Sequence, residues 1–245
     1  MFPAFSLVIP AFNEAHRIGG TLTEVLRYLQ AMSDGSEVIV VDDGSTDGTS
    51  DVVRKVFTSA GAVETRLIQR SPNSGKGAAV RAGLLAATRP IGLFSDADLS
   101  TPIDEAPKLL EPIVAGQLDV AFGSRALNRG LIGNRQSWHR EQAGRMFNLV
   151  VRTATGLPFW DTQCGFKAFR LEVFRPLLDA ARSDGFSFDV ELLYLAYHAN
   201  LRMREIPVRW NHHEGSKVHF LHDSLHMLQE VIAFRLQQGR GGGSR

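Results

Sequence analysis

The sequence predicts an α/β protein with a mainly parallel central sheet flanked by helices. Short apolar runs rich in Val and Ile alternate with segments of helical period, which is typical of parallel strands joined by crossover helices. Polar residues follow each of these runs directly, as expected where loops leave the carboxyl ends of parallel strands. A chain of 245 residues, 44% of them hydrophobic, is long enough to bury a core around such a sheet.

In the first half of the chain, a strand followed by a helix is expected four times in succession, and a fifth strand comes after them. The apolar runs predict strands at residues 6–9, 38–41, 65–68, 91–94 and 120–122. The segments between them predict helices at residues 15–32, 49–60, 77–87 and 103–115. We see no internal sequence repeat in this half.

The pattern changes after residue 124. Residues 125–140 are rich in Gly and Arg and lack a clear period, so we expect a long loop. Helices are expected at residues 141–155, 171–181 and 188–199. Apolar residues at helical spacing predict a last helix whose apolar face packs on the core: Leu221, Leu225, Leu228 and Ile232. We therefore expect one domain over residues 1–238, with halves at 1–122 and 123–238, and a flexible tail over residues 239–245.

Composition and charge exclude several classes of protein. The single cysteine, Cys164, excludes an intrachain disulfide and fits a reducing, cytoplasmic compartment. No run reaches the ~18 apolar residues of a membrane span. The net charge of +1 argues against a general nucleic-acid binder. Residues 1–122 hold 10 Lys/Arg against 15 Asp/Glu, and residues 123–245 hold 17 against 11, which suits a cleft with a metal on one side and anions on the other.

Two carboxylates follow the fourth apolar run. Asp96 and Asp98 are two residues apart at the expected end of a strand. Mg²⁺ and Mn²⁺ prefer one or two such carboxylates together with the oxygens of a diphosphate. Asp42 and Asp43 follow the second run, where one is expected to form a turn and the other to bind a nucleobase imide or ribose hydroxyls.

Other motifs are incomplete. Lys76 lies between two glycines, but a phosphate loop of the Walker type needs Gly where Arg70 stands and Ser or Thr where Gly77 stands. No G-x-G-x-x-G follows the first strand, which argues against a dinucleotide-binding oxidoreductase. Cys164 lacks a base at a suitable spacing, and residues 212–214 (His-His-Glu) do not have a zinc spacing. Asp189 and Glu191 have two explanations, carboxylates that point into the cleft and steer sugar hydroxyls or acids at a helix N-terminus, and the second is preferred.

Six segments, in this order, resemble the motifs of family 2 glycosyltransferases with the GT-A fold. They are PAFNE at 10–14, VDDGSTDGT at 41–49, GKGAAVR at 75–81, DAD at 96–98, GSR at 123–125 and DTQCGFK at 161–167. Within that family they are most similar to the dolichyl- or polyprenyl-phosphate sugar synthases, in particular to the glucose-transferring branch. The resemblance covers roughly residues 5–217, and six motifs in order are far more specific than any one of them.

The resemblance implies a role for each matching residue. The base and ribose of a nucleotide sugar would be held by Pro10, Ala11, Glu14, Asp42 and Asp43. Asp96 and Asp98 would hold Mg²⁺ or Mn²⁺ and the diphosphate. The acceptor phosphate would be bound by Arg125 together with Arg140 or Arg135, and the diphosphates would be covered by Lys217. Three further residues are placed among the substrate contacts: Lys76, Gly77 and Gln163.

The implied reaction is an inverting, metal-dependent transfer of a hexose, glucose from UDP-glucose, to a dolichyl or polyprenyl phosphate. A phosphate acceptor is already an oxyanion, so it needs arginines to position it and no general base. The chain departs from its relatives in two ways: Ser100 stands where the mannose branch often has Gln, and the membrane helices of many relatives are missing. We therefore expect a cytoplasmic enzyme that meets its lipid at the cytoplasmic membrane face.

Three alternatives remain at this stage. One is a GDP-mannose-dependent mannosyltransferase or another family 2 glycosyltransferase. A second is a phosphatase of the haloacid dehalogenase type, because an apolar strand followed by Asp96 and Asp98 and then by hydroxyl residues also fits its nucleophile motif. That motif normally opens the fold, whereas three strands precede it here. A third is a catalytically silent nucleotide-sugar-binding subunit.

Overall fold

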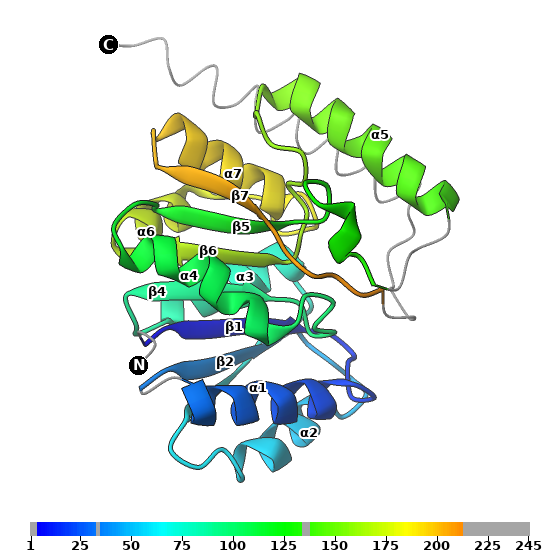
Figure 1. The fold of residues 1–245 in the computed structure, drawn as a ribbon. Coiled ribbons are helices and arrows are strands. Elements are labelled where there is room, and N and C mark those ends of the chain that lie inside the picture. The colour runs from blue at the N-terminus through cyan, green and yellow to red at the C-terminus, as the bar shows by residue number, and fades with distance from the viewer. Residues whose placement is uncertain (1–3, 33–34, 134–137, 213–245) are drawn as a thin grey trace.

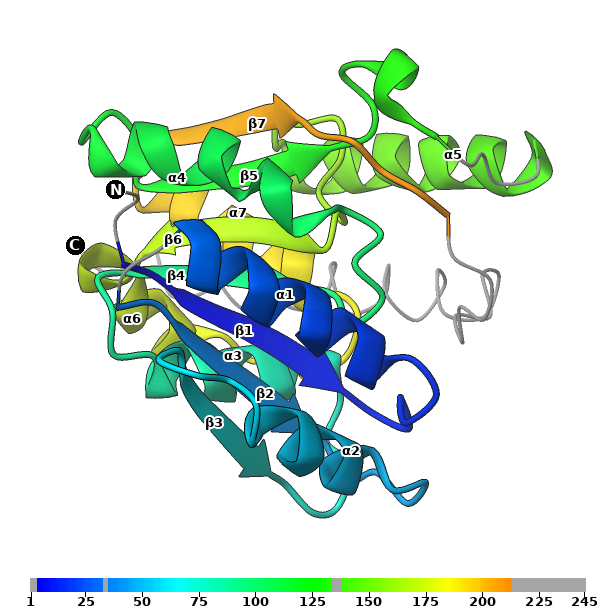
Figure 2. The same ribbon diagram turned by 60° about the horizontal axis from the view of Figure 1, so that its bottom comes forward.

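The computed structural model describes residues 4–32, 35–133 and 138–212, which form a seven-stranded sheet with helices on both faces (Figures 1 and 2). The strand order is β3-β2-β1-β4-β6-β5-β7. Within this sheet β6 is antiparallel to its neighbours β4 and β5, and the other pairings are parallel. The prediction of a mainly parallel sheet flanked by helices is confirmed.

All five predicted strands are present, and two further strands complete the sheet. The bounds are β1 (Ser6–Ala11), β2 (Glu37–Asp42), β3 (Glu64–Gln69), β4 (Ile91–Ser95), β5 (Val120–Ser124), β6 (Phe166–Arg170) and β7 (Met203–Pro207). The sequence analysis missed β6 and β7. Each is short and mixes charged with apolar residues, so neither has the continuous apolar run of a strand that is buried on both faces.

Helices cover both faces of the sheet (Figure 2). One face carries α1 (Ile18–Met32), α2 (Thr49–Phe57) and α4 (Ala106–Val114), and the other carries α3 (Lys76–Ala86), α6 (Leu171–Ala180) and α7 (Phe188–His198). The central strands supply side chains to both cores: along β1, Leu7 and Ile9 join the first face and Val8 the second. This double burial explains the apolar runs in the sequence.

The stretch expected as a loop over residues 125–140 contains more structure than predicted. It includes the short 3₁₀ helix η2 (Arg129–Leu131) and the first turn of α5 (Trp138–Thr155). A second 3₁₀ helix, η1 (Ile103–Glu105), precedes α4. The predicted last helix and the tail at residues 239–245 lie outside the described residues.

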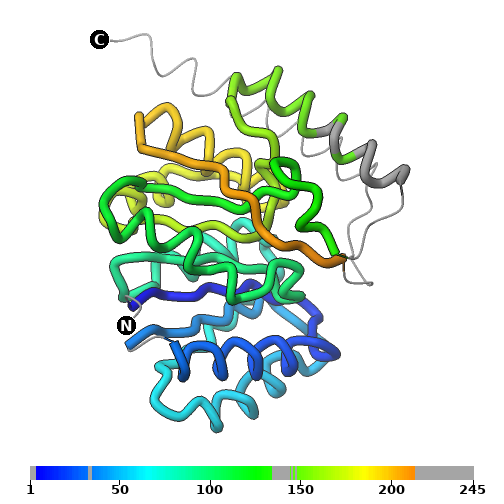
Figure 3. The backbone as a smooth tube through the Cα atoms, viewed as in Figure 1, coloured from blue at the N-terminus to red at the C-terminus, as the bar shows by residue number. Residues whose placement is uncertain are grey.

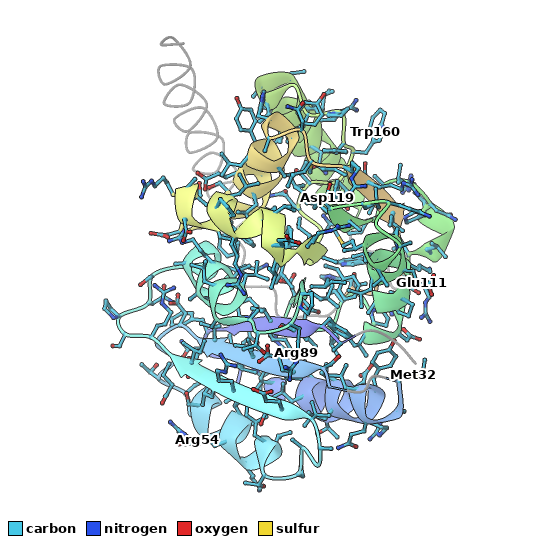
Figure 4. All side chains as sticks on the ribbon, turned by 90° about the vertical axis from the view of Figure 1, so that its left-hand side faces the viewer. Met32, Arg54, Arg89, Glu111, Asp119 and Trp160 are labelled. Carbon is cyan, nitrogen blue, oxygen red and sulfur yellow. The ribbon has the colours of Figure 1, made fainter. Side chains whose placement is uncertain are left out.

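The two ends of the parallel strands differ in chemistry. At the amino ends, the edge that faces the viewer in Figure 4, the buried Glu37 carboxylate accepts hydrogen bonds from Ser6, Thr88 and Arg66, and Arg89 pairs with Glu64 at 2.6 Å. These polar groups form their hydrogen bonds and ion pairs with one another. The loops that leave the carboxyl ends gather at the opposite edge, below α5 in Figure 3, and they carry the predicted site residues.

Candidate functional site

The pair of aspartates lies in the turn that follows β4. The backbone N–H of Asp96 donates to the Gly165 carbonyl at 3.1 Å, and Leu99 N–H closes the turn by donating to the Asp96 carbonyl at 3.2 Å. Asp98 Oδ1 accepts a hydrogen bond from Ser100 N–H at 2.9 Å. Both aspartates are half-buried at the carboxyl edge of the sheet, as the sequence predicts.

A glycine from another motif makes room for the first of these carboxylates. A Cβ atom on Gly165 would lie 2.0 Å from Asp96 Oδ2, far inside van der Waals contact. Gly165 precedes β6, which pairs with β4 with Phe166 opposite Ser95. The antiparallel strand therefore brings the motif at 161–167 against the motif at 96–98.

Lys76 is the cation in direct contact with Asp96. It is the first residue of α3, and its Nζ lies 2.6 Å from Asp96 Oδ1 and 5.4 Å from the centre of the Phe94 ring. Burial lowers the pKa of Lys76, but the charges of Asp96, Asp189 and Asp98 outweigh burial, so the pKa lies above its ordinary value. The ammonium group is therefore charged at neutral pH.

Gly77 serves the packing of α3. Its N–H donates to the Asp184 carbonyl at 2.8 Å, and a Cβ there would lie 2.5 Å from the Ser183 carbonyl oxygen and 2.6 Å from Phe188 Cβ. The backbone N–H of Gly77 thus has a partner within the protein, and the substrate contact expected of Gly77 stays a prediction. The close packing seats the loop before α7 on the N-terminus of α3.

Asp42 forms the turn expected of one of the two aspartates, whereas the binding of a base or ribose by Asp43 stays a prediction. Asp42 shapes the turn, because Oδ1 accepts from Ser45 N–H at 2.9 Å and Oδ2 accepts from the Ser50 hydroxyl. Asp43 Oδ2 accepts from Gly75 N–H at 2.7 Å. Asp43 Oδ1 is buried and makes no hydrogen bond to the described part of the chain, and Arg70 Nε lies 3.9 Å from it.

The loop after β1 closes this part of the site. Pro10 and Ala11 are the last residues of β1, opposite Val41 and Asp42. Glu14 forms an ion pair with Arg17, with Nη2 2.8 Å from Oε1. The Glu14 carboxylate raises the pKa of Arg17, with smaller contributions from Asp98 and Asp96, so the Arg17 charge acts on the aspartate pair.

Arg125 lies across the site, directly after β5. Its Nε and Nη2 donate to the buried Asp161 at 2.7 and 2.8 Å, and its backbone N–H donates to the same carboxylate at 2.9 Å. Its guanidinium carbon lies 5.6 Å from the centre of the Trp210 ring. Burial raises the pKa of Asp161, but Arg125 outweighs burial and holds it below its ordinary value.

The remaining predicted residues are placed only in part. Gln163 is half-buried in the loop between Asp161 and Gly165. Arg140 belongs to α5, but its side chain lies outside the described atoms, as do Arg135 and Lys217. The grouping of Arg140 or Arg135 with Arg125, and the contact of Lys217 with the diphosphates, therefore stay predictions.

Two weaker candidates of the sequence analysis are Cys164 and residues 212–214. Cys164 is buried, and burial raises the pKa of its thiol to about 12, so it is not an activated nucleophile. His212 stacks on Trp210 with ring centres 6.0 Å apart, whereas residues 213 and 214 lie outside the described residues. Within the described ranges, no group of three or more His, Cys, Asp or Glu side chains could hold a metal ion.

The donor set at Asp96 and Asp98 nevertheless fits Mg²⁺ or Mn²⁺ with a nucleotide diphosphate. These cations take one or two carboxylates, keep several waters and complete their coordination with phosphate oxygens. Two hard oxygen ligands beside cationic Lys76 and Arg17 provide both kinds of group, for a metal and for a diphosphate. Such a site needs no third protein ligand.

The sequence analysis missed three charged residues near the site, Arg17, Arg70 and Lys167, and preferred a role at a helix N-terminus for Asp189. Lys167 Nζ lies 2.5 Å from Asp189 Oδ1 and 2.6 Å from the Cys164 carbonyl oxygen, and its side chain is fully buried. Lys167 lies between Phe166 and Phe169 in the sequence, and a lysine within such an apolar segment was a signal for a buried ion pair. Glu191 lies in the first turn of α7, as the preferred explanation expects, and its carboxylate accepts a hydrogen bond from Ser183 N–H at 2.7 Å.

Comparison with known sequences gives a consistent result. The sequence profile of the family described as "Glycosyl transferase family 2" matches residues 6–178. A dolichyl-phosphate beta-glucosyltransferase of Drosophila melanogaster is 38% identical over 224 residues, covering 87% of this chain and 68% of the relative. The protein of the same name from Homo sapiens is 35% identical over 244 residues, covering 95% of this chain and 75% of the relative.

Comparison with solved structures identifies the fold. Glucosyl-3-phosphoglycerate synthase from Mycobacterium tuberculosis, in complex with Mn²⁺, uridine diphosphate and glucosyl-3-phosphoglycerate, superposes with a TM-score of 0.67 at 23% identity, covering 96% of this chain and 79% of that one. Mannosyl-3-phosphoglycerate synthase from Rubrobacter xylanophilus gives a TM-score of 0.68 at 20% identity, covering 99% and 76%. Both share the arrangement of sheet and helices described above.

Proposed function

Because the chain belongs to glycosyltransferase family 2 and has the GT-A fold, we propose that it transfers glucose from UDP-glucose to the phosphate of a dolichyl or other polyprenyl phosphate. The transfer inverts the anomeric carbon and uses Mg²⁺ or Mn²⁺. The observation that carries this proposal is the pair Asp96 and Asp98 at the end of β4, with Lys76 on one side and Arg125 on the other. The names of the relatives support glucose and dolichyl phosphate.

Two buried atoms support a uridine nucleotide. Asp43 Oδ1 and Arg70 Nη1 are an acceptor and a donor that make no hydrogen bond within the described residues. Unsatisfied buried polar atoms are costly, so a ligand that pairs both is favoured. The imide edge of uracil offers an N–H beside a carbonyl oxygen, which satisfies both atoms. Guanine offers a similar edge, so a mannose donor carrying GDP belongs in the test.

The leaving diphosphate is stabilised at the side of the donor site that carries Asp96 and Asp98. A bound divalent cation offsets the negative charge that develops on the leaving diphosphate. Asp96 and Asp98 supply its carboxylate ligands, and the positive charges of Lys76 and Arg17 add to the field around the diphosphate oxygens. These contacts stabilise only the leaving group. A hydroxyl nucleophile would in addition need a base to deprotonate it.

The acceptor side has a positioning cation, and two ionisable groups near it in the described part of the chain, Asp189 and Cys164, are not available as bases. The Asp161 charge keeps the pKa of Arg125 above its ordinary value despite burial, so the guanidinium stays charged, and Asp161 fixes its orientation. Asp189 is paired with Lys167 and Cys164 is a neutral thiol. An acceptor that is already ionised, such as a phosphate monoester, matches this arrangement.

The surface near Arg125 suits a lipid acceptor. Met146, Leu149 and Val150 expose apolar side chains on α5, and Trp160, next to Asp161, is 55% exposed at the outer boundary of the molecule (Figure 4). Arg152 lies 3.7 Å from the Trp160 ring. Aromatic and basic side chains of this kind favour the interface of a bilayer. None of the described helices has the length and hydropathy of a membrane span, and we propose peripheral association with the cytoplasmic membrane face.

The test is a transfer assay with a panel of donors. The protein is incubated with dolichyl phosphate in vesicles, with Mn²⁺, and with radiolabelled UDP-glucose, UDP-N-acetylglucosamine or GDP-mannose. We expect labelled lipid from UDP-glucose at a rate at least about tenfold above the other donors, since contacts with one sugar hydroxyl contribute on that scale. Excess chelator should abolish the product.

Each other outcome identifies an alternative. Faster transfer from GDP-mannose would replace the donor assignment, and equal product in chelator would remove the metal from the mechanism. UDP binding without transfer to any lipid phosphate would favour a silent binding subunit. The phosphatase hypothesis is not retained, because the Asp96 motif follows the fourth strand of a glycosyltransferase fold.

A further inference from the structure

Four charged side chains form a continuous cluster behind the donor loops. Asp96 Oδ1 pairs with Lys76 Nζ at 2.6 Å, and Asp189 Oδ1 pairs with Lys167 Nζ at 2.5 Å. The two ammonium groups lie 5.4 and 6.0 Å from the centre of the same ring, that of Phe94. The four residues come from the turn after β4, the start of α3, the start of α7 and β6. The cluster thus joins the predicted metal ligands to two residues with no role in the proposed mechanism.

The inner pair is held in place by burial. The side chain of Lys167 is 0% exposed and that of Asp189 is 5% exposed. A buried ion pair pays a large desolvation penalty and seldom stabilises a fold more than apolar side chains of the same volume, so stability alone does not explain it. The Asp189 carboxylate also acts on Lys76, because the two charges interact across the cluster. Lys76 therefore has a second carboxylate within electrostatic range.

The outer pair conflicts with metal binding. Of the two Asp96 oxygens, Oδ2 is the one nearer to the Gly165 position, and Oδ1 is in contact with the Lys76 ammonium. A divalent cation that binds Asp96 must compete with this ammonium group. Lys76 is 25% exposed and Asp96 is 32% exposed, so both can rearrange without opening the core.

We propose that Lys76 is a displaceable internal counterion of Asp96, and that the Asp189 carboxylate, fixed in place by Lys167, attracts the displaced ammonium and holds it beside the donor. This inference rests on the proposed function only for the identity of the ligand, a divalent cation. It makes Lys76 and Asp189 positioning residues for metal loading. A nucleotide diphosphate then promotes metal binding in two ways, as a ligand of the metal and as a new anion for Lys76.

The test measures Mn²⁺ binding to nucleotide-free protein by electron paramagnetic resonance of the free ion. Wild-type protein is compared with Lys76→Met, which keeps the length of the side chain and removes the charge. We expect Mn²⁺ to bind roughly tenfold more tightly to Lys76→Met, the change that corresponds to about one pKa unit of differential interaction. The increase in Mn²⁺ affinity that UDP produces should be smaller in the variant than in wild type, because the counterion no longer has to be displaced.

Two control variants separate contact from general charge. Arg17→Gln removes a cation whose charge also reaches Asp96 and Asp98 but whose partner is Glu14, so Mn²⁺ affinity should rise by less than about threefold. Lys55→Met removes an exposed charge on α2 and should leave Mn²⁺ affinity unchanged. Equal increases in Lys76→Met and Arg17→Gln would show that only the summed charge matters and would overturn the counterion role.

A double-mutant cycle tests the role of Asp189. Asp189→Asn should weaken Mn²⁺ binding in the wild-type background and have a smaller effect in the Lys76→Met background, because Asp189 acts through Lys76. Additive effects would overturn the positioning role of Asp189. Failure of wild-type protein to bind Mn²⁺ even with UDP would contradict the proposed function itself, whereas normal binding that Lys76→Met does not strengthen would contradict only this inference.

Discussion

Asp98→Ala is expected to lower the rate of glucose transfer to dolichyl phosphate by about a thousandfold or more, equivalent to about 4 kcal/mol of transition-state stabilisation. The substitution removes one of the two carboxylates that are proposed to hold the cation beside the leaving diphosphate. The rate is measured as labelled lipid formed from UDP-glucose at saturating Mn²⁺. Product at more than about a tenth of the wild-type rate would contradict the assignment of Asp98 as a metal ligand.

A companion variant controls for local structure. Asp98 Oδ1 also accepts a hydrogen bond from Ser100 N–H, so the alanine variant removes a turn contact together with the charge. Asp98→Asn keeps an oxygen acceptor for that contact and removes the charge. Both variants should lose transfer while the midpoint of thermal unfolding changes little in Asp98→Asn. Recovery of activity in the Asn variant would show that the turn, and not the metal, is what Asp98 provides.

Arg125→Ala is expected to produce the second-largest loss, about a hundredfold or more in kcat/KM for dolichyl phosphate. Hydrogen bonds to a charged group contribute about 1.5 to 3 kcal/mol each, and the variant loses those that the guanidinium is proposed to make to the acceptor phosphate. Asp161 holds that guanidinium in place through two side-chain contacts. Arg125→Lys should recover only part of the activity, since a lysine keeps the charge and loses the planar fork. The measurement is a titration of acceptor at saturating UDP-glucose.

The donor site provides the control for this variant. UDP binding in the presence of Mn²⁺ should be unchanged in Arg125→Ala, because Arg125 lies on the acceptor side and pairs with Asp161. A matched variant, Asp161→Asn, should reduce acceptor use as well by leaving the guanidinium without its fixed partner. If Arg125→Ala weakens UDP as strongly as it impairs the acceptor, the division between donor and acceptor sides is incorrect.

Four of the five predicted strands, β1, β2, β4 and β5, are buried along their whole length. β1 places Val8 in one core and Leu7 and Ile9 in the other, which makes its sequence a continuous apolar run. β3, the fifth, lies at the edge of the sheet and is only half-buried. β6 was missed because it contains Lys167, whose charge is neutralised by Asp189. That partner lies 22 residues further along the chain, and no periodicity reports it. β7 was missed because its alternating charged residues lie at the edge of the sheet.

The candidate site was predictable to the extent that it follows from strand ends. Asp43 and Asp96 lie where parallel strands place them, and the structure brings them to the same edge. The role of Gly165 was not predictable from spacing, since it depends on the antiparallel pairing of β6 with β4. The pairing of Lys76 with Asp96 likewise depends on how the start of α3 packs against the loop before α7. Such contacts between motifs require the three-dimensional arrangement.

The central claim is that a divalent cation held by Asp96 and Asp98 carries the diphosphate of the donor. Titration calorimetry of UDP into wild-type protein, with Mn²⁺ and then with excess chelator, measures this dependence without any catalytic step. We expect UDP to bind at least about tenfold more tightly with Mn²⁺, a coupling in the range usual for two linked ligands. The same affinity in both conditions would contradict the claim.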